Sequence, residues 1–252
     1  MRFPPFHFLK FNRLYLFVVY FLVTLTVHGQ QDNPDRLVRE SAISKAIAAY
    51  HAQSGEQAWL FNGIQYLRTP YKIEENAHFY FQSSALASGS IVYDNVFYDN
   101  LLLLHDEVTD QVIARDITNL HFVQLVASRI SSFTIGNARF KRFEKNDSLS
   151  GGLQGFYQVL TDGQTSLLKK EIKTVREDVT SQGVLRYIDI RTSYHVRNTG
   201  KYEPVNSVKS LMKCFGSRKD EVRKHMKKLR IRFRSDKENY ILTAITYYDQ
   251  IH

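Results

Sequence analysis

The fold is decided by the stretch Gly89-Ser90-Ile91-Val92-Tyr93-Asp94-Asn95-Val96-Phe97-Tyr98. Two runs of β-branched and aromatic residues flank Asp94-Asn95, a pair that tolerates the positive φ angles of a two-residue hairpin turn. Trp59-Leu60-Phe61 and Ile64-Gln65-Tyr66 flank Asn62-Gly63 in the same manner. The sequence therefore predicts two β-hairpins of the same kind.

Further short runs of strand-forming residues follow, with no helical period between them. They cover residues 78–82, 101–105, 111–115, 121–125, 131–135, 138–143, 155–160, 166–175 and 185–197, with turn signals at Gly136-Asn137, Gly151-Gly152 and Asp162-Gly163. About ten to twelve short strands at this spacing indicate an antiparallel sheet, folded as a sandwich or a partly closed barrel.

Residues with a period of 3.6 flank this β region on both sides. Residues 35–53 predict an N-terminal helix, with Gly55 after its end. Three more helices are expected after Tyr202-Glu203-Pro204. Their expected apolar faces are Val208, Leu211, Met212 and Phe215 in the first, Val222, Met226 and Leu229 in the second, and Ile241, Ala244, Ile245, Tyr248 and Ile251 in the third.

The ends of the three C-terminal helices also carry signals. Gly216 is expected to end the first helix, and Ser217 to cap the second. Ser235 and Glu238 have the spacing of a capping box for the third helix. The overall expectation is an α+β fold with a signal peptide (1–29), an N-terminal helix (30–56), an antiparallel β domain (57–200) and a basic helical tail (201–252).

The first 29 residues have the composition of a secretory leader. They contain three basic residues and no acidic one, and an apolar run extends from Leu14 to Val27. A run of this length would form a helix of about 21 Å, shorter than the ~30 Å hydrocarbon core of a bilayer. We therefore expect a cleaved signal peptide, no transmembrane span after cleavage, and a protein exported to the periplasm, the outer membrane or the exterior of the cell.

Composition excludes several classes of protein. With 43% hydrophobic and 13% aromatic residues, the chain of 252 residues is too apolar to be intrinsically disordered. Its single Cys, Cys214, excludes an intrachain disulfide framework and a Cys-based zinc site. Near the C-terminal end of its expected helix, Cys214 is predicted to be a packed side chain and not a nucleophile.

No motif in the chain predicts a catalytic, cofactor-binding or metal-binding residue. The seven His residues after position 29 lie more than five positions apart, so a ligand pair on one strand or helix turn is absent. His105-Asp106-Glu107, near Asp110, is the densest cluster of titratable side chains, and we interpret it as a solvated turn. Neither a nucleophile elbow nor a phosphate-binding loop is present.

Positive charge is concentrated near the C-terminus. Residues 197–237 contain 14 Lys and Arg against 4 Asp and Glu, whereas residues 30–196 contain 17 against 19. The residues expected to contact an anionic surface are Lys219, Arg223, Lys224, Lys227, Lys228, Arg230, Arg232 and Arg234. The alternation Arg230-Ile231-Arg232-Phe233-Arg234 is also compatible with a strand beside this face.

Such a cationic surface has three interpretations. It can contact lipopolysaccharide, anionic phospholipid or a polyanionic glycan, where each Lys or Arg contributes roughly 1 kcal/mol. It can be a solvated face without a partner. Three helices with short connections also suggest a DNA-binding helix-turn-helix, but an exported protein does not meet its own DNA, so no nucleic-acid partner is expected.

Several stretches resemble a family of uncharacterised secreted or envelope proteins of Bacteroidota. They are Leu60–Tyr66, Gly89–Tyr98, Gly155–Gly163, Lys201–Val205, Asp220–Leu229 and Tyr247-Tyr248-Asp249, so the resemblance covers residues 37–251. The family usually has Asp-Gly where this chain has Asp94-Asn95, and Asn also tolerates the turn. The resemblance implies an exported location, and it supplies no substrate, cofactor or catalytic residue.

Together these observations favour a non-enzymatic binding or scaffolding protein of the cell envelope, with an anionic surface or another protein as its partner. Two alternatives remain open. A hydrolase of envelope glycan would need two facing carboxylates in the β domain. A carrier of apolar ligands would need a barrel cavity lined by the many Tyr and Phe residues.

Overall fold

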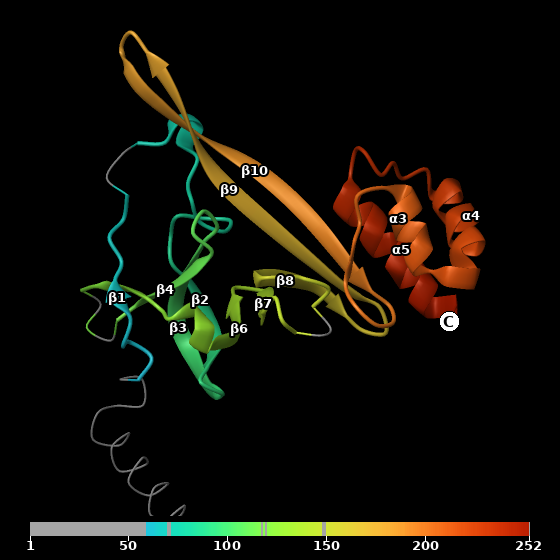
Figure 1. The fold of residues 1–252 in the computed structure, drawn as a ribbon, viewed down its shortest axis with the longest axis horizontal. Coiled ribbons are helices and arrows are strands. Elements are labelled where there is room, and N and C mark those ends of the chain that lie inside the picture. The colour runs from blue at the N-terminus through green and yellow to red at the C-terminus, as the bar shows by residue number, and fades with distance from the viewer. Residues whose placement is uncertain (1–58, 70–71, 117, 119, 148–149, 252) are drawn as a thin grey trace, which may run out of the picture. The chain divides into compact units, whose positions relative to one another are not determined.

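The computed structural model describes residues 59–69, 72–116, 118, 120–147 and 150–251. These residues form one compact unit, an antiparallel β-sheet with helices near the C-terminus (Figure 1). The predicted leader at 1–29 and the predicted N-terminal helix lie outside the described residues. The α+β class and the antiparallel sheet expected from the sequence are confirmed.

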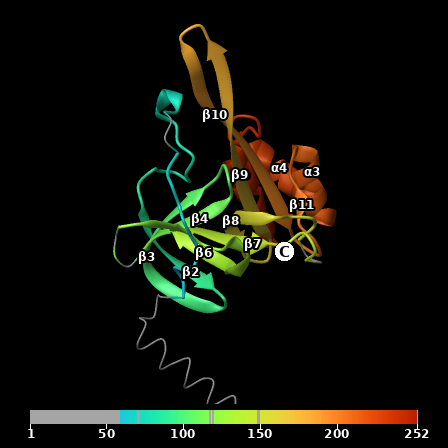
Figure 2. The same ribbon diagram turned by 60° about the vertical axis from the view of Figure 1, so that its left-hand side comes forward.

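Within the described residues the sheet has eleven strands, all paired antiparallel, in the order β1-β5-β4-β3-β2-β6-β7-β8-β9-β10-β11. The strands are β1 (Ile64–Gln65), β2 (Ala87–Tyr93), β3 (Val96–Asp106), β4 (Gln111–Arg115), β5 (Phe122–Gln124), β6 (Ile130–Ile135), β7 (Ala138–Phe143), β8 (Gly155–Asp162), β9 (Ser166–Thr180), β10 (Gly183–Arg197) and β11 (Glu203–Pro204). Short 3-10 turns, η2 (Glu74–Asn76) and η3 (Ala127–Arg129), interrupt the connections. The sheet is not closed, and Figure 2 shows its curvature from a second side.

The two predicted hairpins have different outcomes. Asp94 and Asn95 have φ angles of 49° and 64°, and Tyr93 pairs with Val96, so the second hairpin is confirmed. The first hairpin was a wrong prediction, because β1 pairs with β5 and residues 59–61 form a turn. A side chain at Gly63 would collide with the Gln124 carbonyl. Glycine is therefore needed at this position because the backbone of the neighbouring strand approaches closely, and not because a turn requires a positive φ angle.

Most of the other predicted strands exist, and several of them are longer than expected. Residues 111–115 and 138–143 have the predicted bounds, while β9 continues to Thr180 and β10 begins at Gly183. Residues 78–82 form only a single bridge, between Tyr80 and Asp106, so the strand predicted there was wrong. This segment lies across the end of β3, where Phe81 N–H donates to His105 O.

The main core lies on one face of strands β2 to β8. The rings of Phe133 and Phe140 stack with centroids 4.6 Å apart, and Phe156 meets Phe133 edge to face at 5.2 Å. Phe81 completes the group by an edge contact with Phe140 at 5.0 Å. Large aromatic side chains therefore fill the interior of this part of the sheet.

Three α-helices follow β11: α3 (Val208–Cys214), α4 (Lys219–Leu229) and α5 (Lys237–Ile251), with a 3-10 turn η4 (Gly216–Arg218) between the first two. The three predicted helices are thus confirmed, although two of their predicted caps are wrong. Ser217 lies inside η4, and the N-cap residue of α4 is Arg218, without a side-chain cap. Asp236 Oδ1 accepts the Asn239 N–H at the start of α5, while Glu238 turns toward the sheet.

The helices pack on the base of the β9–β10 ribbon. Leu167 and Val196 of the ribbon share a core with Leu211, Ile241 and Ile245 of the helices. Lys169 on β9 forms an ion pair with Glu238 at 2.9 Å, and the Thr165 hydroxyl donates to Asp249 Oδ1 at 2.6 Å. The basic tail is therefore docked on the sheet and is not a free arm.

Candidate functional site: the basic face of the C-terminal helices

The helix α4 separates its apolar and cationic residues onto opposite sides. Val222 and Met226 are buried against α3 and α5, as the sequence predicts. Leu229 was expected to face inward as well, but it is 45% exposed because the helix ends there and Arg230 takes a left-handed conformation. The five predicted cations of the helix, Lys219, Arg223, Lys224, Lys227 and Lys228, are all exposed.

The remaining predicted cations lie in the connection between α4 and α5. Arg230, Arg232 and Arg234 are exposed, so they extend the cationic surface beyond the helix. The alternative of a strand at 230–234 was wrong. Arg230 has a φ of 55°, and backbone bonds from Ser235 and Asp236 to Arg232 O close a turn. We call the cations of α4 and of this connection the basic face.

Acidic side chains neutralise only part of the basic face. Arg223 pairs with Asp220 and Arg218 with Glu221, each at 2.9 Å and one helical turn apart. Within the described chain, the other cations of the face have no acidic partner: Lys219, Lys224, Lys227, Lys228, Arg230, Arg232 and Arg234. Neighbouring cations on α4 are one to four positions apart, about 6 Å or less along the helix axis, and so within one Debye length of ~8 Å at physiological salt. They therefore act together on a charged surface.

A groove of about 480 Å³ adjoins the basic face between α3 and α4. Lys209 and Lys213 of α3 and Lys219 and Arg223 of α4 line it, and the buried Met212 belongs to its wall. Each pair of cations is four positions apart in a helix, which places both side chains on one side of that helix. The groove can hold a compact anionic group among side chains from two helices.

The sequence prediction omitted Lys209 and Lys213. Both were within reach of sequence reasoning, since they lie off the apolar face formed by Val208, Leu211 and Met212. What the sequence does not reveal is that α3 and α4 meet at an angle that brings the two pairs of cations to one groove.

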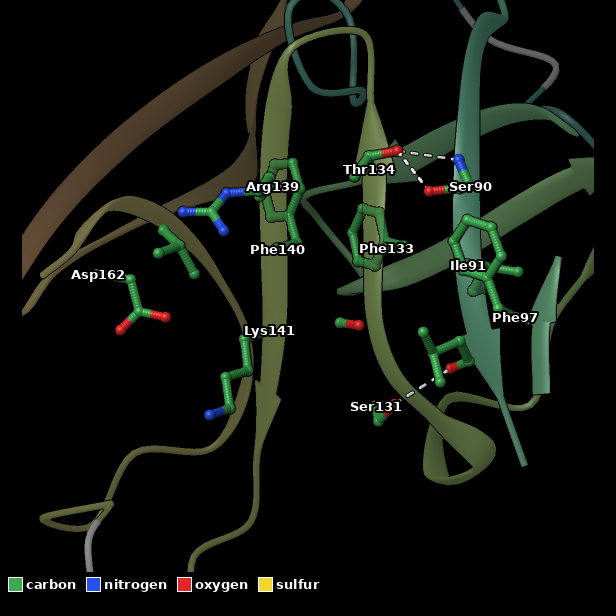
Figure 3. A pocket seen from close by; sticks show the side chains of 13 residues that line it. Ser90, Ile91, Phe97, Ser131, Phe133, Thr134, Arg139, Phe140, Lys141 and Asp162 are labelled. Carbon is green, nitrogen blue, oxygen red and sulfur yellow. Dashed lines mark hydrogen bonds between the residues drawn. The ribbon is translucent and has the colours of Figure 1, made fainter. Parts of the chain in front are cut away.

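A second hollow, of about 370 Å³, lies on the open face of β2, β6, β7 and β8 (Figure 3). Arg139 and Lys141 of β7 line this hollow and extend to the side on which Asp162 lies, whereas Phe97, which is 63% exposed, lies on the opposite side. Its hydroxyl groups are partly used internally, because Thr134 Oγ1 lies 2.9 Å from both the backbone nitrogen and Oγ of Ser90. Asp162 is the one carboxylate that lines it.

The cluster around His105 is buried, so its interpretation as a solvated turn was wrong. His105 is only 3% exposed and lies among the rings of Phe133, Phe140 and Phe156. Its Nε2 atom donates to Asp110 Oδ1 at 3.1 Å. Asp106 and Glu107 are buried as well.

Asp110 is the centre of this polar network. Its Oδ2 accepts from Lys170 Nζ at 2.7 Å and from the Phe156 N–H at 3.1 Å. Burial alone would raise the pKa of Asp110, but the hydrogen bond from His105 and the charge of Lys170 outweigh it and hold the pKa below its usual value. These contacts hold the β3–β4 turn against β8 and β9. The buried charges of this network therefore have a structural role.

A second buried ion pair joins the same turn to β9. Lys173 Nζ lies 3.0 Å from Glu107 Oε2, and it also donates to the carbonyl oxygens of His78 and Tyr80. Burial raises the pKa of Glu107, although the neighbouring ammonium group of Lys173 opposes that effect. The sequence could not reveal this pair, because its members are 66 positions apart and no local pattern links them.

Cys214 is half-buried, and its Sγ lies 3.5 Å from the Ser210 carbonyl. Burial raises the pKa of the thiol to about 11, which disfavours the thiolate. Among the described residues no group of three His, Cys, Asp or Glu side chains is arranged to hold a metal ion. In the same part of the chain no helix has the length and apolar character needed to cross a membrane.

Comparisons of this chain with protein-family models, with curated proteins and with solved structures gave no match.

Proposed function

We propose that the protein is a non-enzymatic binding module of the cell envelope, which attaches to an anionic surface through its basic face. The observation that supports the proposal is the row of exposed cations on α4, which continues into the α3–α4 groove and lacks acidic partners for most of its members. The exported location, the cleaved leader and the kinship with envelope proteins belong to this proposal, as does the sandwich or partly closed barrel expected for the sheet.

The magnitude of the attraction is sufficient for reversible attachment. Near an anionic lipid surface each exposed cation contributes roughly 1 kcal/mol. Arg223 contributes less, because Asp220 already pairs with it, so Lys219, Lys224, Lys227 and Lys228 provide the main contribution. About 4 kcal/mol corresponds to millimolar affinity from the helix alone, and the cations of residues 230–234 add to it.

Two features make binding a better proposal than glycan hydrolysis or transport of apolar ligands. A glycosidase needs a pair of carboxylates at a defined separation, and Asp162 is the one carboxylate that lines either hollow described above. The aromatic side chains expected to line a carrier cavity instead contact one another in the core, as Phe133, Phe140 and Phe156 do.

The test is charge reversal with a matched control. The variant Arg223→Glu, Lys224→Glu, Lys227→Glu, Lys228→Glu is compared with the variant Arg139→Glu, Lys141→Glu, Lys145→Glu, Lys201→Glu, which changes the net charge by the same amount elsewhere. Co-sedimentation with vesicles containing phosphatidylglycerol at low salt measures binding.

We expect the first variant to lose binding and the second to keep most of it, with both folded by circular dichroism. Equal binding by the wild type and the α4 variant would refute the proposal. Loss confined to the control variant would move the anionic contact to the hollow of Figure 3.

A further inference from the structure

The ribbon formed by β9 and β10 extends well beyond the strands that flank it. The two strands pair over fifteen residues each. The paired residues run from Ser166 opposite Arg197 at one end to Thr180 opposite Gly183 at the other. On the outer side of β9, β8 pairs only as far as Lys169, and β11 accompanies β10 only at His195 and Val196. The far part of the ribbon therefore has no further strand partner among the described residues (Figure 1).

This far part carries apolar side chains that a ribbon in water does not favour. Val179 is 84% exposed, and Val184 and Leu185 are also exposed. A two-stranded hairpin by itself is only marginally stable, and a long unprotected edge is a template for another strand. The ribbon therefore has both apolar surface and backbone groups to offer a partner.

The backbone groups on the outer edge of β9 can be assigned from one hydrogen bond. Lys173 N–H donates to Glu107 O, away from β10, at 3.1 Å. Because inward and outward groups alternate along an antiparallel strand, Val175, Glu177 and Val179 also direct their N–H and C=O groups outward. Within the described chain these groups have no backbone partner.

The sequence of this edge is self-complementary. It reads Thr174-Val175-Arg176-Glu177-Asp178-Val179-Thr180, so reversing it about Glu177 exchanges Thr with Thr, Val with Val and Arg with Asp. We propose that two copies of the chain associate edge to edge through residues 174–180 of β9, antiparallel and with a twofold axis at Glu177. This inference does not depend on binding to an anionic surface.

The proposed pairing fits both the backbone hydrogen-bonding groups and the charged side chains of this edge. It forms about six backbone hydrogen bonds, because the outward groups of Val175, Glu177 and Val179 in each copy meet those of the other. Arg176 lies opposite Asp178 of the second copy, and opposite charges at such positions stabilise a sheet. In the single chain Arg176 pairs with Asp178 of its own strand and lies 3.5 Å from Asp189, and the Arg176 and Asp178 side chains are about half exposed. Association therefore exchanges exposed ion pairs within one chain for ion pairs between the two copies.

The pairs that already exist between β9 and β10 of each copy continue the match across all four strands of the joined sheet. Val175 pairs with Ile188 and Val179 with Val184, so one face of the joined sheet has two rows of four aliphatic side chains. Between these rows the two Glu177 side chains face each other, and Arg186, whose Nε lies 2.7 Å from Glu177 Oε1 in each copy, offsets their repulsion. Two-fold interfaces of this self-complementary kind are the commonest among soluble oligomers.

The experiment is a charge swap followed by sedimentation velocity of the purified protein over a wide range of concentration. Arg176→Asp places like charges opposite each other at two positions of the pair, as does Asp178→Arg. We expect each single variant to dimerise at least about ten-fold more weakly than the wild type. The double variant Arg176→Asp, Asp178→Arg restores the opposite charges and is expected to dimerise as the wild type does.

A mixture of the two single variants gives the most specific test of the proposed pairing. In equal amounts, Arg176→Asp and Asp178→Arg chains present only acids to only bases, so they are expected to form a heterodimer although neither forms a homodimer of wild-type strength. The control variants Arg218→Asp and Glu221→Arg alter an ion pair of equal exposure on the tail and are expected to leave association unchanged. A wild type that stays monomeric throughout, single swaps without effect, or a mixture that fails to associate would each overturn the proposal.

Discussion

The buried network around Asp110 allows a quantitative prediction for the variant Asp110→Asn. Asparagine keeps the shape of the side chain, but it removes the charge that holds Lys170 Nζ at 2.7 Å. The side chains of Lys170 and Asp110 are 12% and 29% exposed, so the ammonium group would lose its partner in a mostly buried site. Breaking a fully buried ion pair costs about 3–5 kcal/mol, and partial exposure reduces this to about 2–4 kcal/mol.

Urea denaturation at pH 7 measures the change in the free energy of unfolding. Glu144→Gln is the control, because the Glu144 side chain is 66% exposed in its ion pair with Arg142, and a carboxylate that stays in water contributes about 0–1 kcal/mol through such a pair. A loss for Asp110→Asn no larger than that of the control would refute the structural role given to the cluster.

The same comparison has a pH dependence of known sign. The pKa of Asp110 is lower in the folded chain than its usual value, so its carboxylate stabilises the fold above the unfolded pKa of about 3.9. This contribution is lost as the pH falls through the lower pKa of the folded state. The difference in stability between the wild type and Asp110→Asn should therefore be full at pH 7 and should shrink below about pH 4. A difference that grows on acidification would contradict this.

Three further predictions concern single positions. Gly155→Ala should cost more stability than Gly152→Ala, roughly 2–3 against 1 kcal/mol by thermal unfolding, because a Cβ at Gly155 collides with Asp110 whereas Gly152, with a similar positive φ, faces open space; equal losses would contradict this. Glu238→Gln should weaken the docking of α5 by about 1–2 kcal/mol, since Glu238 accepts from both Lys169 and Tyr194, and hydrogen exchange in α5 should accelerate; unchanged exchange would show that these contacts are dispensable. Iodoacetamide at pH 8 should alkylate Cys214 far more slowly in the folded chain than in urea, because burial raises the pKa of its thiol to about 11; equal rates would exclude that environment.

Local signals in the sequence were sufficient for much of the fold. The apolar periods of the tail predict three helices, and Asp94-Asn95 predicts the β2–β3 hairpin, because in these places the determining interactions are between near neighbours. Asn62-Gly63 carries the stronger turn signal and yet forms no hairpin. Leu60 is fully buried in the core and β1 pairs with a strand sixty residues away, so tertiary contacts override the local preference.

The residues of the candidate site also divide into those that local sequence patterns predict and those that depend on tertiary packing. The cations of α4 follow from helical periodicity, whereas Lys209 and Lys213 join them only through the packing of α3 on α4. The burial of His105 could not be read from its neighbours, because the aromatic rings around it come from β6, β7 and β8. The self-complementary stretch Thr174–Thr180 can be read from the sequence. It indicates an interface only because the structure shows that this edge of β9 has no strand partner in the described chain.

The central claim, that the basic face contacts an anionic surface, is tested most directly by an environment-sensitive fluorophore placed on that face. In a Cys214→Ser background, Glu221→Cys puts the label on the side of α4 that carries Lys224 and Lys228, and Glu144→Cys puts it at the end of β7 as a matched control. On addition of vesicles containing phosphatidylglycerol, we predict a blue shift for the label at position 221, reversed by high salt, and none for the label at position 144. A shift at position 144 alone, or at neither position while the protein is bound, would contradict the claim.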